Sequence, residues 1–299
     1  MKAKKGADVI FDIVLYSIMI LVVIVTLYPF LNVLAISFND SLDTVKGNAF
    51  IIPRKFTLNN YREIFRYSNL GHAFFVSVAR TVVGTLTGVI SSCMLAYTLS
   101  REDFVFRKSI TALFIITMYV SGGLIPDYLL IRNLHLIDSF WVYIIPGLIS
   151  PFNVIVIRSF IDGIPKSLQE SARLDGANDF VIFYKIVMPL CVPVIATIAL
   201  FIAVGQWNSW FDTYLYASND PNLSTLQYEL VKILDNTNAT TAQTASILNR
   251  NSSSALVNAV SPESIRMAIT IIATVPILLV YPFVQKYFIT GLTLGAVKS

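Results

Sequence analysis

Charged residues are scarce in this sequence. They occupy 13% of its 299 positions, about half the share that is usual in a soluble domain. Hydrophobic residues occupy 55%, which is too much for a disordered chain and leaves too few polar side chains to cover a soluble fold. The two cysteines and two histidines lack the spacing of metal ligands, so we expect no metal site. The composition therefore predicts a protein whose natural solvent is a lipid bilayer.

Motifs of enzymes and carriers are missing as well. No glycine is followed by lysine, so the phosphate-binding loop G-x-x-x-x-G-K-[ST] is absent, and we expect no ATP site and no cofactor in this chain. The patterns G-x-S-x-G and H-E-x-x-H are also absent. No acidic residue lies inside a long apolar run, which disfavours an ion-coupled carrier without excluding it. We therefore expect a protein that is not an enzyme by itself.

Six uncharged runs are long enough to cross a membrane as helices, for which about 20 residues are needed. Their length favours helices over the strands of a membrane barrel, which have about 10 residues of alternating polarity. The sequence thus predicts an all-α, polytopic membrane protein with six transmembrane helices. The six runs are 13–30, 81–100, 109–126, 139–157, 186–211 and 267–285.

The distribution of basic residues predicts the orientation of these spans. If the N-terminus lies inside, the segments 1–8, 101–108, 158–185 and 286–299 are internal and carry more lysine and arginine than the longer external segments. We therefore expect a multi-pass protein of the bacterial plasma (inner) membrane, surrounded by lipid, with both termini in the cytoplasm. Because no basic patch is interleaved with aromatic residues, we expect no nucleic acid partner.

The expected layout is a single transmembrane domain over 1–299. It consists of a first span at 9–38, an outer loop at 39–71, a core of five spans at 72–288 with an inner loop at 158–189 and a second outer loop at 217–264, and a cytoplasmic tail at 289–299. The spacing of leucines predicts a further helix over 223–234. Gly84, Gly88 and Ser92 recur every four residues, which predicts a tight helix contact within one chain or between two chains.

The inner loop begins with the signature of a short helix. Ser167 and Glu170 have the spacing of a capping box, in which the two side chains satisfy backbone groups at the start of a helix. This predicts a helix that begins just after Pro165 and ends near Asp175.

A turn and a second helix are expected to follow. Gly176 suits the left-handed conformation that ends a helix, and Asn178 or Asp179 can cap the next helix, which leads into the fifth span. A projecting helix of this kind can bind a partner and transmit its motion to the spans. The same residues also fit a purely structural loop, in which Glu170 only caps its helix and Gly176 only permits the turn.

This loop resembles the E-A-A motif of the permease subunits of ATP-binding-cassette importers. That motif has Glu-Ala-Ala, three variable residues, Gly, nine variable residues, Ile, one variable residue and Leu-Pro. Two positions depart from it: Ser171 replaces the second motif residue, alanine, with another small residue, and Met188 replaces the leucine with another apolar residue. Residues 73–288 would form the shared core, and 287–298 also resemble the tail of carbohydrate-importer permeases. The positions assigned to the motif are Glu170, Ser171, Ala172, Asp175, Gly176, Ala177, Ile186 and Pro189, of which Asp175 and Ala177 match its sugar-importer form.

The resemblance implies a MetI-like, type I importer architecture and a set of partners. These are a second homologous permease, leaning towards a heterodimer, two cytoplasmic ATP-binding subunits that hold ATP and Mg, and an extracytoplasmic sugar-binding protein. The first helix of the loop would be the coupling helix, in which Glu170 contacts the ATPase and Ala172 keeps the helix face small. The expected substrate is an oligosaccharide, including acidic plant or algal ones. An ion-coupled secondary sugar transporter is the alternative, and a membrane-embedded glycosyltransferase is a further rival.

Candidate substrate contacts combine aromatic rings with hydrogen-bonding side chains. The richest group is Gln206, Trp207, Asn208 and Trp210 near the outer end of the fifth run, although an interfacial aromatic belt would also explain the tryptophans. Weaker candidates are Tyr119 with Ser121, Gly122 and Gly123 in the third run, and Asn153 in the fourth.

Arg80 is an unusual residue for its position. It should lie about 12 Å below the outer end of its helix, where an arginine is costly unless it extends outward to water. The expected behaviour is such an outward extension. The alternative is that Arg80 faces the substrate path and favours an acidic sugar.

Overall fold

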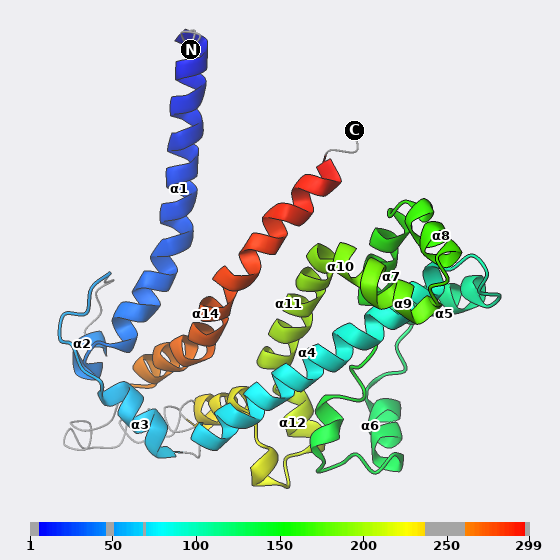
Figure 1. Ribbon diagram of the computed structural model, residues 1–299. Helices are drawn as coiled ribbons and strands as arrows, with labels where there is room; N and C mark the ends of the chain where they lie inside the picture. Colours follow the sequence, from blue (N-terminus) through cyan, green and yellow to red (C-terminus); the bar gives the residue numbers. More distant parts are fainter. Residues whose placement is uncertain (1–5, 46–50, 68–69, 237–260, 297–299) are drawn as a thin grey trace. The chain divides into compact units, whose positions relative to one another are not determined.

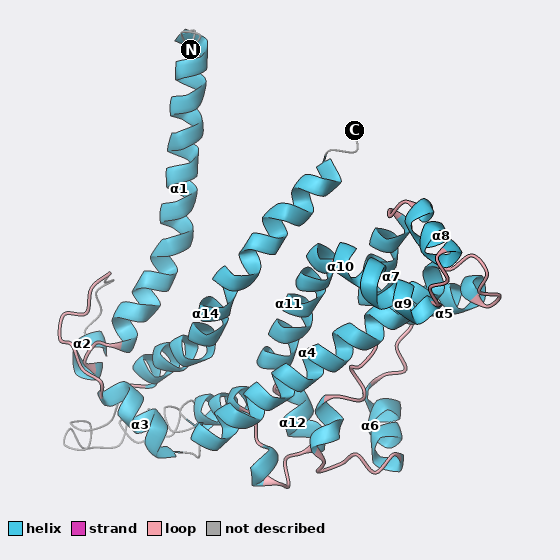
Figure 2. Cartoon of the chain, in the orientation of Figure 1, coloured by secondary structure: helices cyan, strands magenta, loops and turns pink. Residues whose placement is uncertain are grey.

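The structure is a computed structural model that describes residues 6–45, 51–67, 70–236 and 261–296. Helices dominate it, and within these residues no strand occurs beyond an isolated bridge between Asn39 and Phe56 (Figure 2). The all-α prediction is therefore confirmed. The elements are α1 (Gly6–Ser37), α2 (Ser41–Val45), α3 (Asn59–Tyr67), α4 (Leu70–Ser100), α5 (Arg107–Tyr119), α6 (Leu124–Asn133), η1 (Phe140–Tyr143), α7 (Pro151–Asp162), α8 (Lys166–Leu174), α9 (Asp179–Ile182), η2 (Phe183–Val187), α10 (Met188–Leu190), α11 (Val192–Asn208), α12 (Phe211–Tyr216), η3 (Pro221–Leu223) and α14 (Pro262–Ala296) (Figure 1).

Three of the described helices are long and apolar enough to cross a membrane: Ile10–Ser37 within α1, all of α4, and Pro262–Pro282 within α14. A fourth candidate is the pair Asp179–Leu190 and Val192–Asn208, whose two parts bend by 81°. Three of the six predicted runs therefore lie on helices of sufficient length, and the run 186–211 is a fourth if the bent pair is counted as one span.

The other two runs are broken, so six unbroken spans are not confirmed. In the run 109–126, α5 ends at Tyr119 and the chain passes through Gly123 with a φ of 89° before α6 begins. In the run 139–157, only the short η1 and, after Pro146, the start of α7 are helical. Glycine at positive φ and prolines without an N–H group interrupt the helical hydrogen bonds at these places.

The chain divides into two compact units, 1–68 with 230–275 and 69–229 with 276–299. In the first unit, buried polar side chains fix the turn after α1. The Asn60 side chain donates to the carbonyls of Ser37 and Asn39 at 2.8 and 3.0 Å, and Tyr61 Oη donates to Ser37 Oγ at 2.8 Å. These bonds satisfy groups that would otherwise be buried without partners.

Helices predicted beyond the apolar runs are also present. Residues 226–236 are helical, with Leu226 and Leu230 buried, which confirms most of the helix predicted over 223–234. The rest of the second outer loop, from 237 to 260, lies outside the described residues. α14 continues to Ala296, so the described part of the predicted tail is helical. The single domain over 1–299 stays a prediction.

The second unit is built around α4, which packs against α7 and α11. Its core is apolar, with Cys93, Leu99, Ile157 and Ile198 almost fully buried. Gly84 and Gly88 lie in this contact: a Cβ atom on Gly88 would approach Ile202 Cδ1 to 3.3 Å. The small residues thus serve a tight helix contact within this chain.

Candidate functional site

The loop between α7 and α11 folds as a short helix, a turn and a second helix. The Gly176 amide donates to the Arg173 carbonyl and the Ala177 amide to the Ala172 carbonyl, at 3.0 and 2.9 Å. These two bonds form a Schellman motif, which needs the positive φ of 84° that Gly176 supplies. Next, Asn178 Oδ1 accepts from the Val181 amide at 2.9 Å and caps α9. The turn at Gly176 and the cap at Asn178 are therefore confirmed.

The predicted capping box is wrong. α8 begins at Lys166 with Pro165 at its N-cap, and no side chain caps it. Ser167 therefore lies inside the first turn instead of before it. Pro165 has no N–H group to satisfy and a φ fixed near the helical value, so it starts this helix without the help of Ser167 and Glu170.

α8 presents most of its surface to its surroundings. None of its residues is buried, Leu174 is 89% exposed, and within the described residues the Glu170 carboxylate makes no hydrogen bond or ion pair. Ala172 and Ala177 are half-buried and pack against the core around α4. The small side chain of Ala172 lets α8 lie close to the core, and Ala177 packs in the same way just after the helix, while the outer face of α8 is exposed.

Ion pairs tie this loop to the end of α4. Lys166 pairs with Glu102, while Arg101 pairs with Asp179 and, at 2.5 Å, with Asp103. The Arg101 guanidinium lowers the pKa of Asp103 to about 2, and the hydrogen bond from Lys166 lowers the pKa of Glu102. Both carboxylates are well exposed, so these pairs contribute to the placement of the loop more than to stability.

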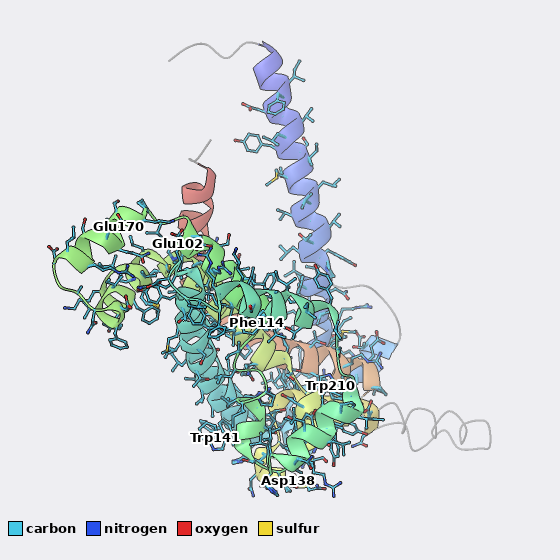
Figure 3. The ribbon with its side chains drawn as sticks, turned by 90° about the vertical axis from the view of Figure 1, so that its right-hand side faces the viewer. Glu102, Phe114, Asp138, Trp141, Glu170 and Trp210 are labelled. Atoms are coloured by element: carbon cyan, nitrogen blue, oxygen red, sulfur yellow. The ribbon has the colours of Figure 1, made fainter. Side chains whose placement is uncertain are left out.

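A cleft of about 410 Å³ lies between α8 and the segment 100–107. Charged side chains line much of it, among them Arg107, Glu170 and Arg173. Figure 3 shows Glu170 and Glu102 at one end of the second unit, and Asp138, Trp141 and Trp210 at the other. The predicted coupling residue Glu170 and the predicted substrate contact Trp210 therefore lie at opposite ends of the second unit.

Arg80 is the centre of a buried polar cluster at the end of the second unit that carries Trp210, called the Trp210 end below. Its side chain is 2% exposed and donates to Gln206 Oε1 at 3.0 and 2.9 Å, and to the carboxylate of Asp212 at 2.5 and 3.1 Å. It also donates to the Ser209 carbonyl at 3.3 Å and lies 4.4 Å from the ring centroid of Tyr143. Asp212 balances its charge, and Gln206 and the tyrosine ring complete its surroundings.

The expected outward extension of Arg80 is therefore wrong. The carboxylate of Asp212, a partner of opposite charge, replaces the water that an extended side chain would have reached. The sequence analysis did not predict Asp212, which directly follows the run 186–211, or Tyr143 as partners of Arg80. The available signal was that an arginine within a membrane helix needs a partner, and Asp212 is the acid nearest to the Gln206 region.

The remaining candidates differ in exposure. Trp207 is buried and packs edge-on against Phe74, whereas Trp210 is 38% exposed. Asn208 is exposed and accepts from Gln227 Nε2 at 3.3 Å. Asn153 is 8% exposed in α7, and Tyr119 is 84% exposed at the end of α5. The structure brings Arg80 and Gln206 into one cluster, and Trp210 follows Gln206 just after the end of α11. Tyr119 and Asn153 lie on other elements, α5 and α7.

Comparison with known proteins gives consistent matches over nearly the whole chain. A family described as "Binding-protein-dependent transport system inner membrane component" matches residues 7–293. The polygalacturonan/rhamnogalacturonan transport system permease protein YtcP of Bacillus subtilis (strain 168) is 38% identical, over 97% of this chain and 99% of its own length. Protein LplC of the same organism is 40% identical over 92% and 90%.

A solved structure is similar as well. It is that of a bacterial ABC transporter involved in the import of the acidic polysaccharide alginate. One of its chains is 28% identical to this chain, with a TM-score of 0.81 and coverage of 96% of this chain and 100% of that one. The similarity therefore extends to the arrangement of the elements.

Proposed function

Because the chain belongs to the family of binding-protein-dependent transport system inner membrane components, we propose that it is the permease subunit of an ATP-driven oligosaccharide importer and forms half of its translocation pathway. The subunit is not an enzyme by itself. ATP and Mg would be bound by two cytoplasmic ATPase subunits, and an extracytoplasmic binding protein would deliver the sugar. A second, homologous permease would form a heterodimer with this chain and complete the pathway. The heterodimer would lie in the inner membrane, and this chain would have six spans with both termini in the cytoplasm.

The exposed α8 is the observation that carries this proposal. A helix with an exposed outer face is suited to fit into a cleft of another protein. Ala172 on its inner face, and the Schellman turn with Ala177 after it, hold this helix against the core. The assigned role of Glu170 is contact with the ATPase. Ser171 and Asp175 share this surface, and Gly176 ends the helix.

The chain itself provides a path from α8 to the opposite end of the second unit. α9, η2 and α10 follow the turn, with Ile186 and Pro189 of the motif in η2 and α10, and the chain then bends by 81° into α11. The far end of α11 carries Gln206 and the Arg80 cluster. A displacement of α8 by a closing ATPase would therefore act on α11 directly, which is how ATP binding would alter the sugar pathway.

We assign the substrate path to the Trp210 end and to the third and fourth runs. Trp210 and Asn208 are exposed and suited to contact a sugar by its faces and hydroxyl groups. Gln206, Trp207 and Arg80 would hold these residues in place, because their side chains are buried or fully hydrogen-bonded. Tyr119 and Asn153 are further contacts. The relative named for polygalacturonan and the structure of an alginate importer favour an acidic oligosaccharide.

Co-purification from native membranes tests the proposal. The wild-type chain should bring down an ATPase subunit in mild detergent, and a Glu170→Ala, Gly176→Trp double variant should lose it. A Glu263→Ala variant is the matched control, because it removes an exposed carboxylate at the start of α14, which is not part of the loop in sequence. Helix content by circular dichroism should be equal in all three. Absence of an ATPase from the wild-type preparation would refute the importer.

A further inference from the structure

The segment that leads into α3 exposes a group of apolar side chains in the first unit. Ile52 is 75% exposed, Phe56 67% and Ile51 57%, and Leu58 is 52% exposed. Large apolar side chains that gather on a surface mark a contact with another molecule or with a membrane. The coupling loop and the substrate path belong to the second unit, so neither accounts for these residues.

Backbone pairing holds this segment against the end of α1. The Asp40 amide donates to the Lys55 carbonyl at 2.9 Å, and the Thr57 amide donates to the Phe38 carbonyl at 2.8 Å. The ring of Phe56 stacks on that of Phe38, with centroids 5.4 Å apart. Phe38 directly follows the last residue of α1. The exposed side chains are therefore fixed close to the point at which α1 ends.

The end of α1 lies at the surface of the bilayer. The apolar stretch Ile10–Ser37 has 28 residues, which as a helix measure about 42 Å, whereas the hydrocarbon core of a bilayer is about 30 Å thick. The last turns of α1 therefore lie at the edge of the hydrocarbon on the side opposite the N-terminus. Figure 1 shows the segment that leads into α3 beginning at the level of these last turns. Its apolar side chains are therefore placed at the depth of the lipid headgroups.

Basic side chains accompany the apolar ones. Residues 51–67 carry four basic side chains and one acidic side chain, which gives a net charge of +3. They are Arg54, Lys55, Arg62, Arg66 and Glu63. Basic residues are usually fewer on the outer side of a membrane, which is where this segment is expected to lie. The excess of positive charge therefore calls for an anionic partner.

The nearby carboxylates do not supply this partner. Glu63 pairs with Arg66 at 2.9 Å. Asp40 Oδ1 accepts from the amides of Leu42 and Asp43 at 3.1 and 3.3 Å, and so caps its own turn. Within the described residues, Lys55 and Arg62 make no ion pair. Two exposed cations are therefore available beside the apolar side chains.

Lipid headgroups fit this surface better than a protein does. Lysine is depleted at the centre of protein interfaces, yet Lys55 directly precedes the exposed Phe56. On α3, Ile64 is fully buried, and the exposed side chains are two arginines and Phe65. Basic residues combined with aromatic and aliphatic ones are typical of segments that lie in the membrane interface and attract anionic lipids.

We propose that residues 51–58 and the exposed face of α3 form a binding surface for anionic phospholipid, with Ile51, Ile52 and Phe56 inserted among the headgroups. Lys55 and Arg62 contact the phosphates, and the surface holds the outer end of α1 at a fixed depth. This inference requires that α1 crosses the membrane. It does not depend on the sugar or on the ATPase, and so goes beyond the proposed function.

Fluorescence quenching by lipid tests the depth of this surface. The assembled complex with Ile52→Cys, labelled with bimane, is reconstituted in vesicles of phosphatidylcholine and phosphatidylglycerol. A nitroxide on the lipid headgroup should quench it roughly three-fold or more strongly than a label at Ser218→Cys. Ser218 is the matched control, because it is exposed in a polar turn after α12. The native Cys93 and Cys191 are buried and should stay unlabelled.

Quenching of Ile52→Cys no stronger than that of Ser218→Cys would overturn the proposal, because the surface would then face water or a protein. Addition of the extracytoplasmic binding protein separates these two cases, since only a protein contact would change the bimane emission. Neither reading requires ATP or sugar. A failure of the importer function, tested by ATPase co-purification, therefore remains distinguishable.

The lipid preference tests the charge. At equal mole fraction, nitroxide-labelled phosphatidylglycerol should quench the Ile52→Cys label roughly two-fold or more strongly than nitroxide-labelled phosphatidylcholine, and high salt should reduce this preference. A Lys55→Gln, Arg62→Gln double variant should lose the preference. A Lys108→Gln, Arg132→Gln double variant is the control, because it removes two exposed charges from α5 and α6 and should retain it. Equal quenching by both lipids in the parent protein, or equal loss in both double variants, would overturn the assignment of anionic lipid.

Discussion

Gly84 on α4 and Gln206 on α11 lie so close that a Cβ atom on Gly84 would be 2.7 Å from Gln206 Nε2. That amide donates to the Tyr143 carbonyl at 3.0 Å, while Oε1 accepts from Arg80. The absence of a side chain at position 84 is thus the condition for the polar cluster at the Trp210 end. Helix packing and the proposed substrate path are coupled through this one contact.

Gly84→Ala should therefore damage both stability and transport. We expect a loss of about 1–3 kcal/mol in the free energy of unfolding, because the added methyl group overpacks the contact and displaces Gln206. Gly205→Ala is the control. Gly205 directly precedes Gln206 on α11, and a Cβ atom at position 205 meets no atom within 4 Å. Its unfolding temperature should stay equal or rise. Thermal unfolding in detergent checks both variants, and equal destabilisation would contradict the packing argument.

Asp212→Asn should be more harmful than Arg80→Gln. The first change leaves a guanidinium that is 2% exposed without a counter-charge, at a cost of about 3 kcal/mol. The second leaves a carboxylate whose side chain is 23% exposed and can reach water. The double variant should be less destabilised than the sum of the two single variants. Chemical unfolding of the four proteins gives the coupling energy, and strict additivity would mean that the pair is not a functional unit.

The same cluster predicts how Arg80 affects substrate choice. Because Asp212 already balances its charge, Arg80 should act by holding Gln206 and not by attracting an acidic sugar. Arg80→Gln should therefore reduce uptake of an acidic and of a neutral oligosaccharide by the same factor. A selective loss of acidic sugar uptake, measured with labelled sugars of equal length, would show that the arginine meets the substrate directly.

Gly176→Ala should weaken the link to the ATPase more than the fold. A residue with a side chain at a φ of 84° costs about 1–2 kcal/mol, and the exposed turn would relax and displace α8. The amount of ATPase that co-purifies should fall several-fold while helix content stays unchanged. Ser167→Ala is the control in the same helix, since serine is exposed there, does not cap the helix, and alanine favours helix. Loss of the ATPase in both variants would indicate a general sensitivity of α8.

The sequence predicted the parts of this site that depend on neighbouring residues. The turn at Gly176 and the cap at Asn178 are formed within a few positions of the chain, so their signals are local. The partners of Arg80 are 126 and 132 residues away, and no local pattern indicates which of them it meets. The capping box failed because Pro165 already fixes the start of α8. The six runs were too simple a description, since counting uncharged residues ignores the glycines and prolines that break two of them.

Arg101 gives a prediction about pH. The arginine lowers the pKa of Asp103 to about 2 from an ordinary 3.8. A carboxyl with a lowered pKa in the folded protein stabilises it above the ordinary pKa, and this contribution disappears as the pH falls towards 2. Arg101→Gln removes this interaction, so its unfolding temperature should lie below that of the wild type from pH 6 to pH 4.

The difference between Arg101→Gln and the wild type should then shrink as the pH falls from 4 to 2, because Asp103 is protonated in the variant and in the unfolded chain and begins to be protonated in the folded wild type as well. It should also be small throughout, since exposed ion pairs contribute little. Arg132→Gln is the control, because Arg132 is exposed at the end of α6 and makes no ion pair within the described residues. Its unfolding temperature should follow that of the wild type at every pH. A difference for Arg101→Gln that persists at pH 2 would mean that the arginine acts through packing on Tyr97, whose ring centroid lies 5.9 Å from its guanidinium carbon, and not through its carboxylates.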